Sequence, residues 1–140
     1  MSDPRGRLLG IDYGKARIGI AVSDALGINA APLGFIRRES DQQAAQVIAA
    51  LAAREKAVGI VIGMPINADG SYGGNARWVQ QFRAALAKLT PLPITLVDER
   101  YSSSEAEEEL RLAGKWPCEP GKLDAQAAAI VLRRHLDGER

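Results

Sequence analysis

Apolar residues in the first third of the chain gather in short runs separated by turn-forming residues. Leu8–Ile11 is an apolar run of strand length, and Arg17–Val22 follows it after a turn at Gly14–Ala16. A third run, Ala31–Ile36, contains Pro32, which lacks the N–H that a central strand contributes to its ladder. The pattern predicts three antiparallel strands, the third lying at the edge of the sheet.

From Ser40 onward the apolar residues recur at helical spacing, and polar residues mark where helices begin. Ser40–Gln43 matches a capping box, in which the serine side chain accepts a hydrogen bond from the first turn. Ser102 and Glu105 form a second capping box, which opens a helix ending near Gly114. A last helix is predicted over Leu123–Leu136. The apolar positions that define the first two helices are Ala44, Val47, Ile48 and Leu51, and then Val79, Phe82, Leu86 and Leu89.

Two further runs, Val58–Ile62 and Pro93–Val97, have the length of strands and end at Gly63–Pro65 and Asp98–Arg100. Lys115–Lys122 contains two prolines and a glycine and is predicted to be a surface loop. The element order is therefore β-β-β-α-β-α-β-α-α. This order predicts an α/β protein with a five-stranded mixed sheet, three strands antiparallel and two parallel, and helices on both faces. It is the order of the ribonuclease H-like fold.

The length and composition indicate one globular domain. The chain has 140 residues, 46% of them hydrophobic and 25% charged, which is enough to bury the core of a single domain over residues 1–140. No apolar run approaches the roughly 18 residues that span a bilayer, so no membrane partner is expected. The N-terminal residues lack the apolar segment of a signal peptide, and the lone Cys118 cannot form an internal disulfide. We therefore expect a cytoplasmic protein.

The net charge does not identify the partner. Eighteen Lys and Arg residues against seventeen Asp and Glu give +1, far from the strongly basic balance that is typical of nucleic-acid binders. The two signs are nevertheless separated along the chain. Cations concentrate in the first third, and anions concentrate in one later stretch. These residues are Arg5, Arg7, Lys15, Arg17, Arg37 and Arg38, and then Glu105, Glu107, Glu108 and Glu109.

Acidic residues lie where ligands of an open α/β sheet gather, beyond the carboxyl ends of the strands. Asp12 follows the first strand and precedes Gly14, where backbone can approach a ligand. Asp98 and Glu99 follow a parallel strand, and we expect only one of them to face the site because successive strand residues point to opposite sides. Asp124 opens the last helix, and the alanines that follow it allow that helix to lie close to the sheet.

Three converging carboxylates require a cation. Carboxylate oxygens with retained water are what Mg²⁺ or Mn²⁺ prefers. Two such ions roughly 4 Å apart can activate a water and stabilise the leaving oxygen in phosphodiester hydrolysis. The only histidine, His135, lies near a helix end, which disfavours a histidine-dependent or zinc site.

Each acid also has a structural interpretation. Asp12 could be a turn former at the end of a strand. Asp98 or Glu99 could pair with Arg100 or serve the following helix start, and Asp124 could be a first-turn acid stabilised by the helix dipole. Taken singly, these interpretations are as good as ligation or better. Taken together with the element order, the acids favour a metal site.

The sequence resembles the YqgF family of bacterial proteins, described as Holliday-junction resolvases and as nucleases that mature the 5′ end of precursor 16S ribosomal RNA. The resemblance runs from Leu8 to about Leu136. Any one of its five motifs is weak, but all five in order are specific. The motifs are Gly-Ile-Asp-Tyr-Gly-Lys-Ala-Arg-Ile-Gly-Ile-Ala-Val-Ser-Asp (10–24), Ile-Gly-Met-Pro (62–65), Asp-Gly-Ser (69–71), Val-Asp-Glu-Arg (97–100) and Leu-Asp-Ala-Gln-Ala-Ala (123–128).

The resemblance implies that Asp12, Glu99 and Asp124 are the catalytic, metal-binding acids, with Mg²⁺ or Mn²⁺ as cofactor. It selects Glu99 over Asp98, which periodicity cannot do. No acid of the family pattern is missing. Gly63–Pro65, however, occupies the strand end where the better-known resolvases place an acid.

Several cations and one aromatic residue near these acids are candidates for substrate binding. Cations contact phosphates, and an exposed tryptophan can stack on an unpaired base. The alternative is solvated surface charge, with the tryptophan packed as a loop anchor. We also hypothesise that the Lys115–Lys122 loop closes over bound substrate. The candidates are Lys15, Arg17, Arg100, Lys115, Trp116 and Lys122.

The favoured function is a metal-dependent nuclease that processes the 5′ end of precursor 16S rRNA, as structured RNA or within the ribosomal particle. A four-way DNA junction is the alternative substrate, but its two-fold symmetry calls for a dimer, whereas the sequence indicates a monomer or weak dimer. A non-catalytic RNA-binding assembly or transcription-associated factor is a further alternative, which loss of a carboxylate would favour. Asp12–Gly14 followed by Gly19 also resembles a phosphate motif of actin-like ATPases and sugar kinases, which need a second lobe.

Overall fold

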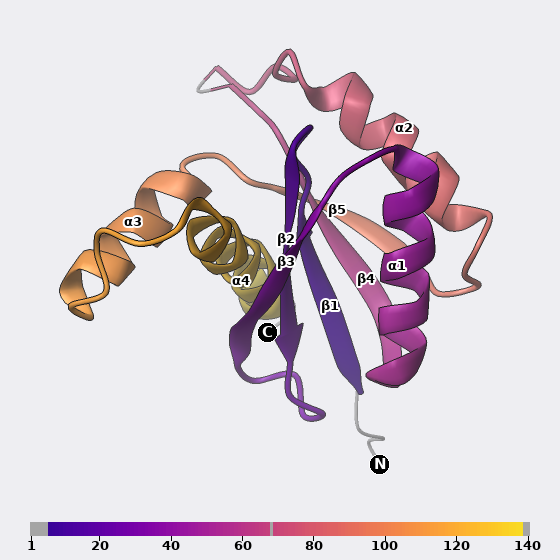
Figure 1. The fold of residues 1–140 in the computed structure, drawn as a ribbon, viewed down its shortest axis with the longest axis horizontal. Coiled ribbons are helices and arrows are strands. Elements are labelled where there is room, and N and C mark those ends of the chain that lie inside the picture. Colours follow the sequence, from indigo (N-terminus) through magenta and orange to yellow (C-terminus); the bar gives the residue numbers. More distant parts are fainter. Residues whose placement is uncertain (1–5, 68, 139–140) are drawn as a thin grey trace.

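The computed structural model describes residues 6–67 and 69–138 and contains a mixed five-stranded sheet in the order β3-β2-β1-β4-β5 (Figure 1). β2 pairs antiparallel with β1 and with β3, whereas β4 lies parallel to β1 and to β5. The predicted combination of antiparallel and parallel strands is confirmed. The strands are β1 (Arg7–Asp12), β2 (Arg17–Ser23), β3 (Ala30–Arg37), β4 (Ala57–Met64) and β5 (Ile94–Asp98).

Helices cover both faces of the sheet, as predicted. α1 and α2 lie against one face, α4 lies against the other, and α3 packs against α4 (Figure 1). Within the described ranges, no helix is both long and apolar enough to cross a membrane. The helices are α1 (Asp41–Arg54), α2 (Ala76–Ala87), α3 (Ser102–Leu112) and α4 (Pro120–Gly138).

The two faces of the sheet are packed differently. Large side chains such as Ile11 and Phe82 fill the layer under α1 and α2. On the other face, α4 contributes mostly small buried residues, and a Cβ added at Gly10 would lie 2.7 Å from Leu132 Cβ and 2.9 Å from the Ala128 carbonyl oxygen. α4 is therefore seated almost directly on the strands, which confirms the expectation drawn from its alanines.

β3 is the edge strand that Pro32 predicts. It pairs with β2, and the register shifts between Ile20 and Ala21, where Ala21 faces Pro32. The irregularity lies beside the residue that cannot donate to the ladder, as expected for proline in a strand.

The serine cap of the first predicted capping box is confirmed, although Gln43 Oε1 accepts from the Glu39 N–H and not from Ser40, and the second predicted box is wrong. The Ser40 side chain accepts a hydrogen bond from the Gln43 N–H at 3.0 Å. At α3 the residue before the helix is Tyr101, whose φ of 62° is left-handed and whose side chain makes no capping bond. The Glu105 carboxylate bonds Arg134 of α4 instead of its own helix start, because a charged partner lies within reach.

Two other boundaries differ from the prediction. α4 begins at Pro120, inside the segment Lys115–Lys122 that was expected to be loop, because proline suits the first turn of a helix. Asp124 consequently lies in the second turn of α4, so it is not a first-turn acid at the helix dipole. At α2 the helix ends at Ala87, and Leu89 lies beyond it with 47% of its surface exposed.

Candidate active site

Strand register places the Asp12 side chain on the α4 face of the sheet. Asp12 ends β1 and pairs directly with Gly19 of β2. The preceding residue, Ile11, belongs to the core under α1 and α2, so the alternation of the strand turns Asp12 to the opposite side. Ile11 also pairs with Ile62 of β4, which brings Asp12 beside Gly63.

Glu99 reaches the same place from the next strand. It follows β5 directly, and its N–H donates to the Met64 carbonyl at 3.1 Å. A Cβ added at Gly63 would overlap Glu99 Oε1 and lie 3.0 Å from Glu99 Cβ and 3.1 Å from Val131 Cγ2 of α4. The Glu99 side chain thus fills the space that a side chain at Gly63 would take. The strand end that lacks an acid in the sequence is occupied by a carboxyl group from the neighbouring strand.

Asp124 is held over β2 by close packing. A Cβ at Gly19 would overlap the Asp124 carbonyl oxygen, so the backbone of α4 rests on the strand at the residue paired with Asp12. Arg17 lies two residues before Gly19, and its Nε donates to Asp124 Oδ2 at 2.6 Å. Asp124 therefore lies near Asp12, but its carboxylate is paired with a guanidinium.

The electrostatics of the site are those of crowded, poorly compensated acids. Burial raises the pKa of Asp12 well above its usual value, and the charge and hydrogen bond of Glu99 and the charge of Asp124 raise it further. Burial also raises the pKa of Glu99, outweighing its hydrogen bond with Asp12 and the charge of Arg134. Glu99 Oε1 is buried and finds no hydrogen-bond partner among the described residues. A cation between these groups would offset both costs.

The donor set fits a hard divalent cation, but the arrangement is incomplete. All the donors are carboxylate oxygens, the ligands that Mg²⁺ and Mn²⁺ prefer, and one buried oxygen lacks a partner. In the parts of the chain that the structure describes, however, no three His, Cys, Asp or Glu side chains are grouped as a metal site. Two of the three predicted acids, Asp12 and Glu99, are in contact, and the third is turned to Arg17.

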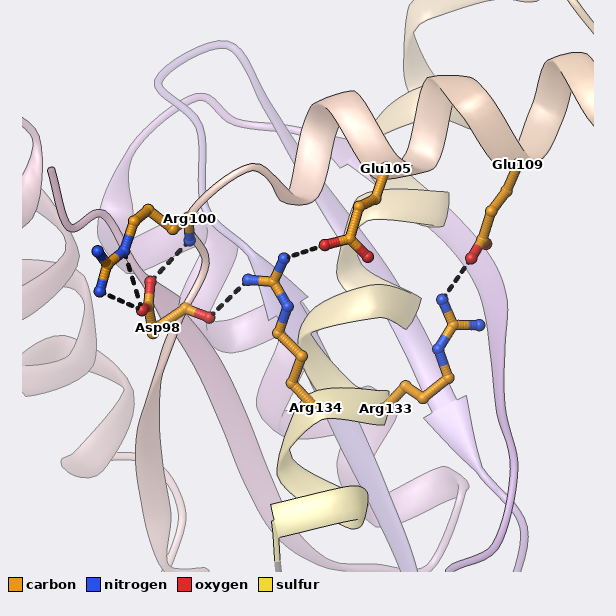
Figure 2. A network of polar contacts seen from close by, with 6 residues as sticks. All are labelled: Asp98, Arg100, Glu105, Glu109, Arg133 and Arg134. Atoms are coloured by element: carbon orange, nitrogen blue, oxygen red, sulfur yellow. Dashed lines mark hydrogen bonds and ion pairs between the residues drawn. The ribbon is translucent and has the colours of Figure 1, made fainter. Parts of the chain in front are cut away.

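Arg134 of α4 supports the strand end that precedes Glu99, a role that no local sequence pattern predicts. Its Nη1 donates to the Asp98 carbonyl at 2.9 Å, and its Nη2 bonds Glu105 of α3 (Figure 2). Asp98 itself turns away from the site and pairs with Arg100 at 2.9 Å. Periodicity alone left open whether Asp98 or Glu99 faces the site. Because Asp98 turns away and successive strand residues alternate, Glu99 is the one that faces it.

The predicted substrate-binding residues are found in two places. Lys15 lies in the turn after Asp12, with Nζ 4.2 Å from the centre of the Trp78 ring. Arg17 is paired with Asp124 and Arg100 with Asp98. The other three lie in and beside the segment before Asp124, where a groove of about 1060 Å³ runs between that segment, α4 and β3.

The two lysines are exposed in that groove, and the tryptophan, which lies between the groove residues Lys115 and Pro117 without lining the groove, is partly packed. Lys115 and Lys122 line the groove together with Phe35 of β3. Trp116 is half-buried, and the guanidinium of Arg111 lies 5.2 Å from the centre of its ring. This contact fits both interpretations of Trp116, as a residue that anchors the loop and as a ring on which a base can stack.

Comparison with known proteins identifies the family. The family model described as "RuvX: Holliday junction resolvase" matches residues 6–138. The chain belongs to the RuvX family. Its curated relatives are similar over most of their length. A "Putative pre-16S rRNA nuclease" of Anaeromyxobacter sp. is 44% identical over 135 residues, covering 94% of this chain and 97% of the relative. A protein of the same description from Synechococcus sp. is 41% identical over 133 residues, covering 94% and 89%.

Solved structures extend the likeness of this RuvX-family chain at the level of the fold. RuvC of T. thermophilus, solved in complex with a Holliday junction substrate, superposes with a TM-score of 0.58 at 15% identity and covers 96% of this chain and 95% of that one. The Fowlpox virus resolvase, solved with Holliday junction DNA, gives a TM-score of 0.54 at 6% identity, covering 95% and 98%. The predicted ribonuclease H-like fold is confirmed by these neighbours.

Proposed function

We propose that this RuvX-family chain is a divalent-metal-dependent nuclease, with Asp12, Glu99 and Asp124 as its metal-binding acids. The buried pair of Asp12 and Glu99 carries the proposal, because Glu99 Oε1 lacks a partner and burial makes charge on both groups costly. The pair lies at the carboxyl end of β1, β4 and β5, where the ligands of such sheets bind. Mg²⁺ and Mn²⁺ both suit an all-oxygen site of this kind.

We assign each of these residues a separate role in phosphodiester hydrolysis. A bound cation would supply an activated water and stabilise the leaving oxygen. Asp12 and Glu99 provide buried carboxylates, and the close packing of α4 on Gly19 fixes where Asp124 stands. We assign contacts with backbone phosphates to Lys15, in the turn after Asp12, and to Arg17, on the neighbouring strand. We assign Lys115 and Lys122, which line the groove beside α4, and the adjacent Trp116 to an extension of this binding surface.

The proposed substrate is the 5′ end of precursor 16S rRNA, either free or in the ribosomal particle. The description of the curated relatives supports this choice, since two of them are 41% and 44% identical to the chain over 94% of its length. A four-way DNA junction is the alternative, supported by the description of the family model. RNA processing needs one active site at a time, so a monomer or weak dimer acting in the cytoplasm suffices.

Cleavage assays on both substrates test the proposal. Purified protein is incubated with a precursor 16S rRNA fragment and with a synthetic four-way junction, with Mg²⁺ or Mn²⁺. We expect cleavage of the RNA that is lost with excess EDTA and in Asp12→Asn. Preferential cutting of the junction would transfer the assignment to the alternative. The same assay is run on assembled precursor particles. If the protein binds these substrates but cleaves none of them, the result would contradict a nuclease and favour a non-catalytic RNA-binding factor.

A further inference from the structure

Arg17 forms an ion pair with Asp124, the third acid of the site, where a metal ion would otherwise bind. Its guanidinium is 2.6 Å from Asp124 Oδ2, with the arginine side chain 38% exposed and the aspartate side chain 21% exposed. Asp124 is the one member of the predicted trio that has a cationic partner in this way. Among the described residues, no three potential ligands are grouped for a metal. The ion pair directs the Asp124 carboxylate to Arg17 of β2.

The placement of Arg17 follows from the fold. Arg17 and Gly19 are two residues apart on β2 and therefore face the same side of the sheet, the side on which α4 lies. Gly19 is paired with Asp12, and the backbone of Asp124 rests on Gly19. An arginine on this strand face is thus within reach of Asp124, while Asp124 lies close enough to Asp12 to act on its charge.

We propose that Arg17 and the divalent cation exchange at Asp124. In the metal-free protein the guanidinium of Arg17 neutralises the Asp124 carboxylate. When the cation binds at Asp12 and Glu99, Asp124 leaves Arg17 and joins the metal ligands. The released guanidinium, at the exposed rim of the site, becomes available to a phosphate of the substrate. Arg17 is in this sense a positioning residue for Asp124, and the inference rests on the metal site of the proposed function.

The exchange makes a prediction with a definite sign. Because binding of the cation has to break the ion pair, removing the guanidinium should strengthen metal binding. We expect Arg17→Gln to bind Mn²⁺ roughly three- to tenfold more tightly than the unchanged protein, the range that a partly exposed ion pair supports. Arg17→Lys, which keeps a cation beside Asp124, should stay close to the unchanged protein. The measurement is calorimetric titration of full-length, metal-stripped protein with Mn²⁺.

The matched control is Arg37→Gln. Arg37 lies on β3 directly opposite Arg17 in the strand register and is exposed, and its side chain forms no ion pair with the described residues. The substitution Arg37→Gln removes one positive charge from the same pair of strands, as Arg17→Gln does, but leaves the partner of Asp124 in place. We expect less than about a twofold change in Mn²⁺ affinity, because an exposed charge without a partner is well screened.

Stability gives a second readout that does not depend on activity. Arg17→Gln should unfold at a lower temperature than the unchanged protein without metal, and this deficit should shrink with saturating Mn²⁺, because the ion pair is absent from the metal-bound state. A deficit of equal size with and without metal would overturn the exchange.

The affinities separate failure of the exchange from failure of the metal site. Unchanged or weaker Mn²⁺ binding in Arg17→Gln, with binding lost in Asp12→Asn, would overturn the exchange and leave the proposed site intact. Tightening of equal size in Arg37→Gln would also overturn it, since the effect would then be one of net charge. Equal Mn²⁺ binding by the unchanged protein and Asp12→Asn would overturn both proposals.

Discussion

Gly63 is the residue whose missing side chain makes room for Glu99 at the end of β4. In Gly63→Ala, the new Cβ would overlap Glu99 Oε1, the mobile end of a side chain, while its other neighbours are 3.0 and 3.1 Å away. We expect a loss of about 1–2 kcal/mol in folding free energy, as for mild overpacking. Displacement of the carboxyl group should lower cleavage and Mn²⁺ affinity roughly tenfold or more, the size of effect seen when a metal ligand is misoriented.

Gly34→Ala is the control for that substitution. Gly34 lies in β3, and a Cβ there would have no neighbour within 4 Å. Mn²⁺ affinity should be unchanged, while thermal unfolding of both variants reports the cost of alanine itself. Full activity in Gly63→Ala would mean that the position of Glu99 over Gly63 is not the functional one.

Asp12 is expected to reduce stability in the metal-free protein. Because burial and the nearby acids raise its pKa in the folded state, folding favours the protonated form, and this contribution to stability is lost as the pH rises from the ordinary value through the raised one. Asp12→Asn cannot ionise. In EDTA at neutral pH it should therefore melt a few degrees higher than the unchanged protein, even though its activity is lost.

The difference in melting temperature should vanish at a pH where Asp12 is protonated in both the folded and the unfolded protein. Below about pH 4, the ordinary value for an aspartic acid, the two proteins should melt at the same temperature in EDTA. Saturating Mn²⁺ should reverse the order at neutral pH, because only the unchanged protein keeps the full ligand set. A lower melting temperature for Asp12→Asn in EDTA at neutral pH would show that the acid is already compensated without metal.

At the scale of elements, α4 holds the end of β5 through one arginine. Arg134 and Arg133 are neighbours on α4 and both bond glutamates of α3, but only Arg134 also reaches the Asp98 carbonyl (Figure 2). Arg134→Gln should lower cleavage roughly tenfold to a hundredfold, the usual effect of losing a group that orients a ligand. Its thermal stability should fall only slightly, because the lost ion pair is partly exposed.

Arg133→Gln is the comparison, because it removes an equivalent bond between α3 and α4. The measurements are cleavage rate and the pH dependence of that rate, since loss of the Arg134 charge should also raise the pKa of Glu99. Equal losses of activity in the two variants would assign both arginines to helix packing alone.

For the molecule as a whole, local patterns predicted the elements and the family resemblance predicted the acids. Apolar runs gave all five strands, and the serine cap of α1 is as expected. The family assignment from five motifs is confirmed by the match over residues 6–138. Helix ends were less predictable, because tertiary contacts decide them. Glu105 has a capping pattern, yet its carboxylate is taken by Arg134, which no local rule can foresee.

The contacts between elements distant in sequence could not be predicted. Arg17 and Asp124 are separated by 107 positions, and only the seating of α4 on Gly19 brings them together. The role of Gly63 also depends on its neighbour, since its lack of a side chain matters only because Glu99, directly after β5, fills the space. The roles of Asp12, Glu99 and Asp124 stay a prediction until metal binding is measured.

α4 carries Asp124 at one end of the site and Arg134 at the other, ten positions later in the sequence. At 1.5 Å per residue, the helix holds these two residues at a fixed separation of about 15 Å along its axis. One residue inserted between these two positions would rotate one against the other by about 100° and break the contact with Arg17 or with Asp98. Length variation in this family should therefore collect in the segment before α4 and be excluded from this part of the helix.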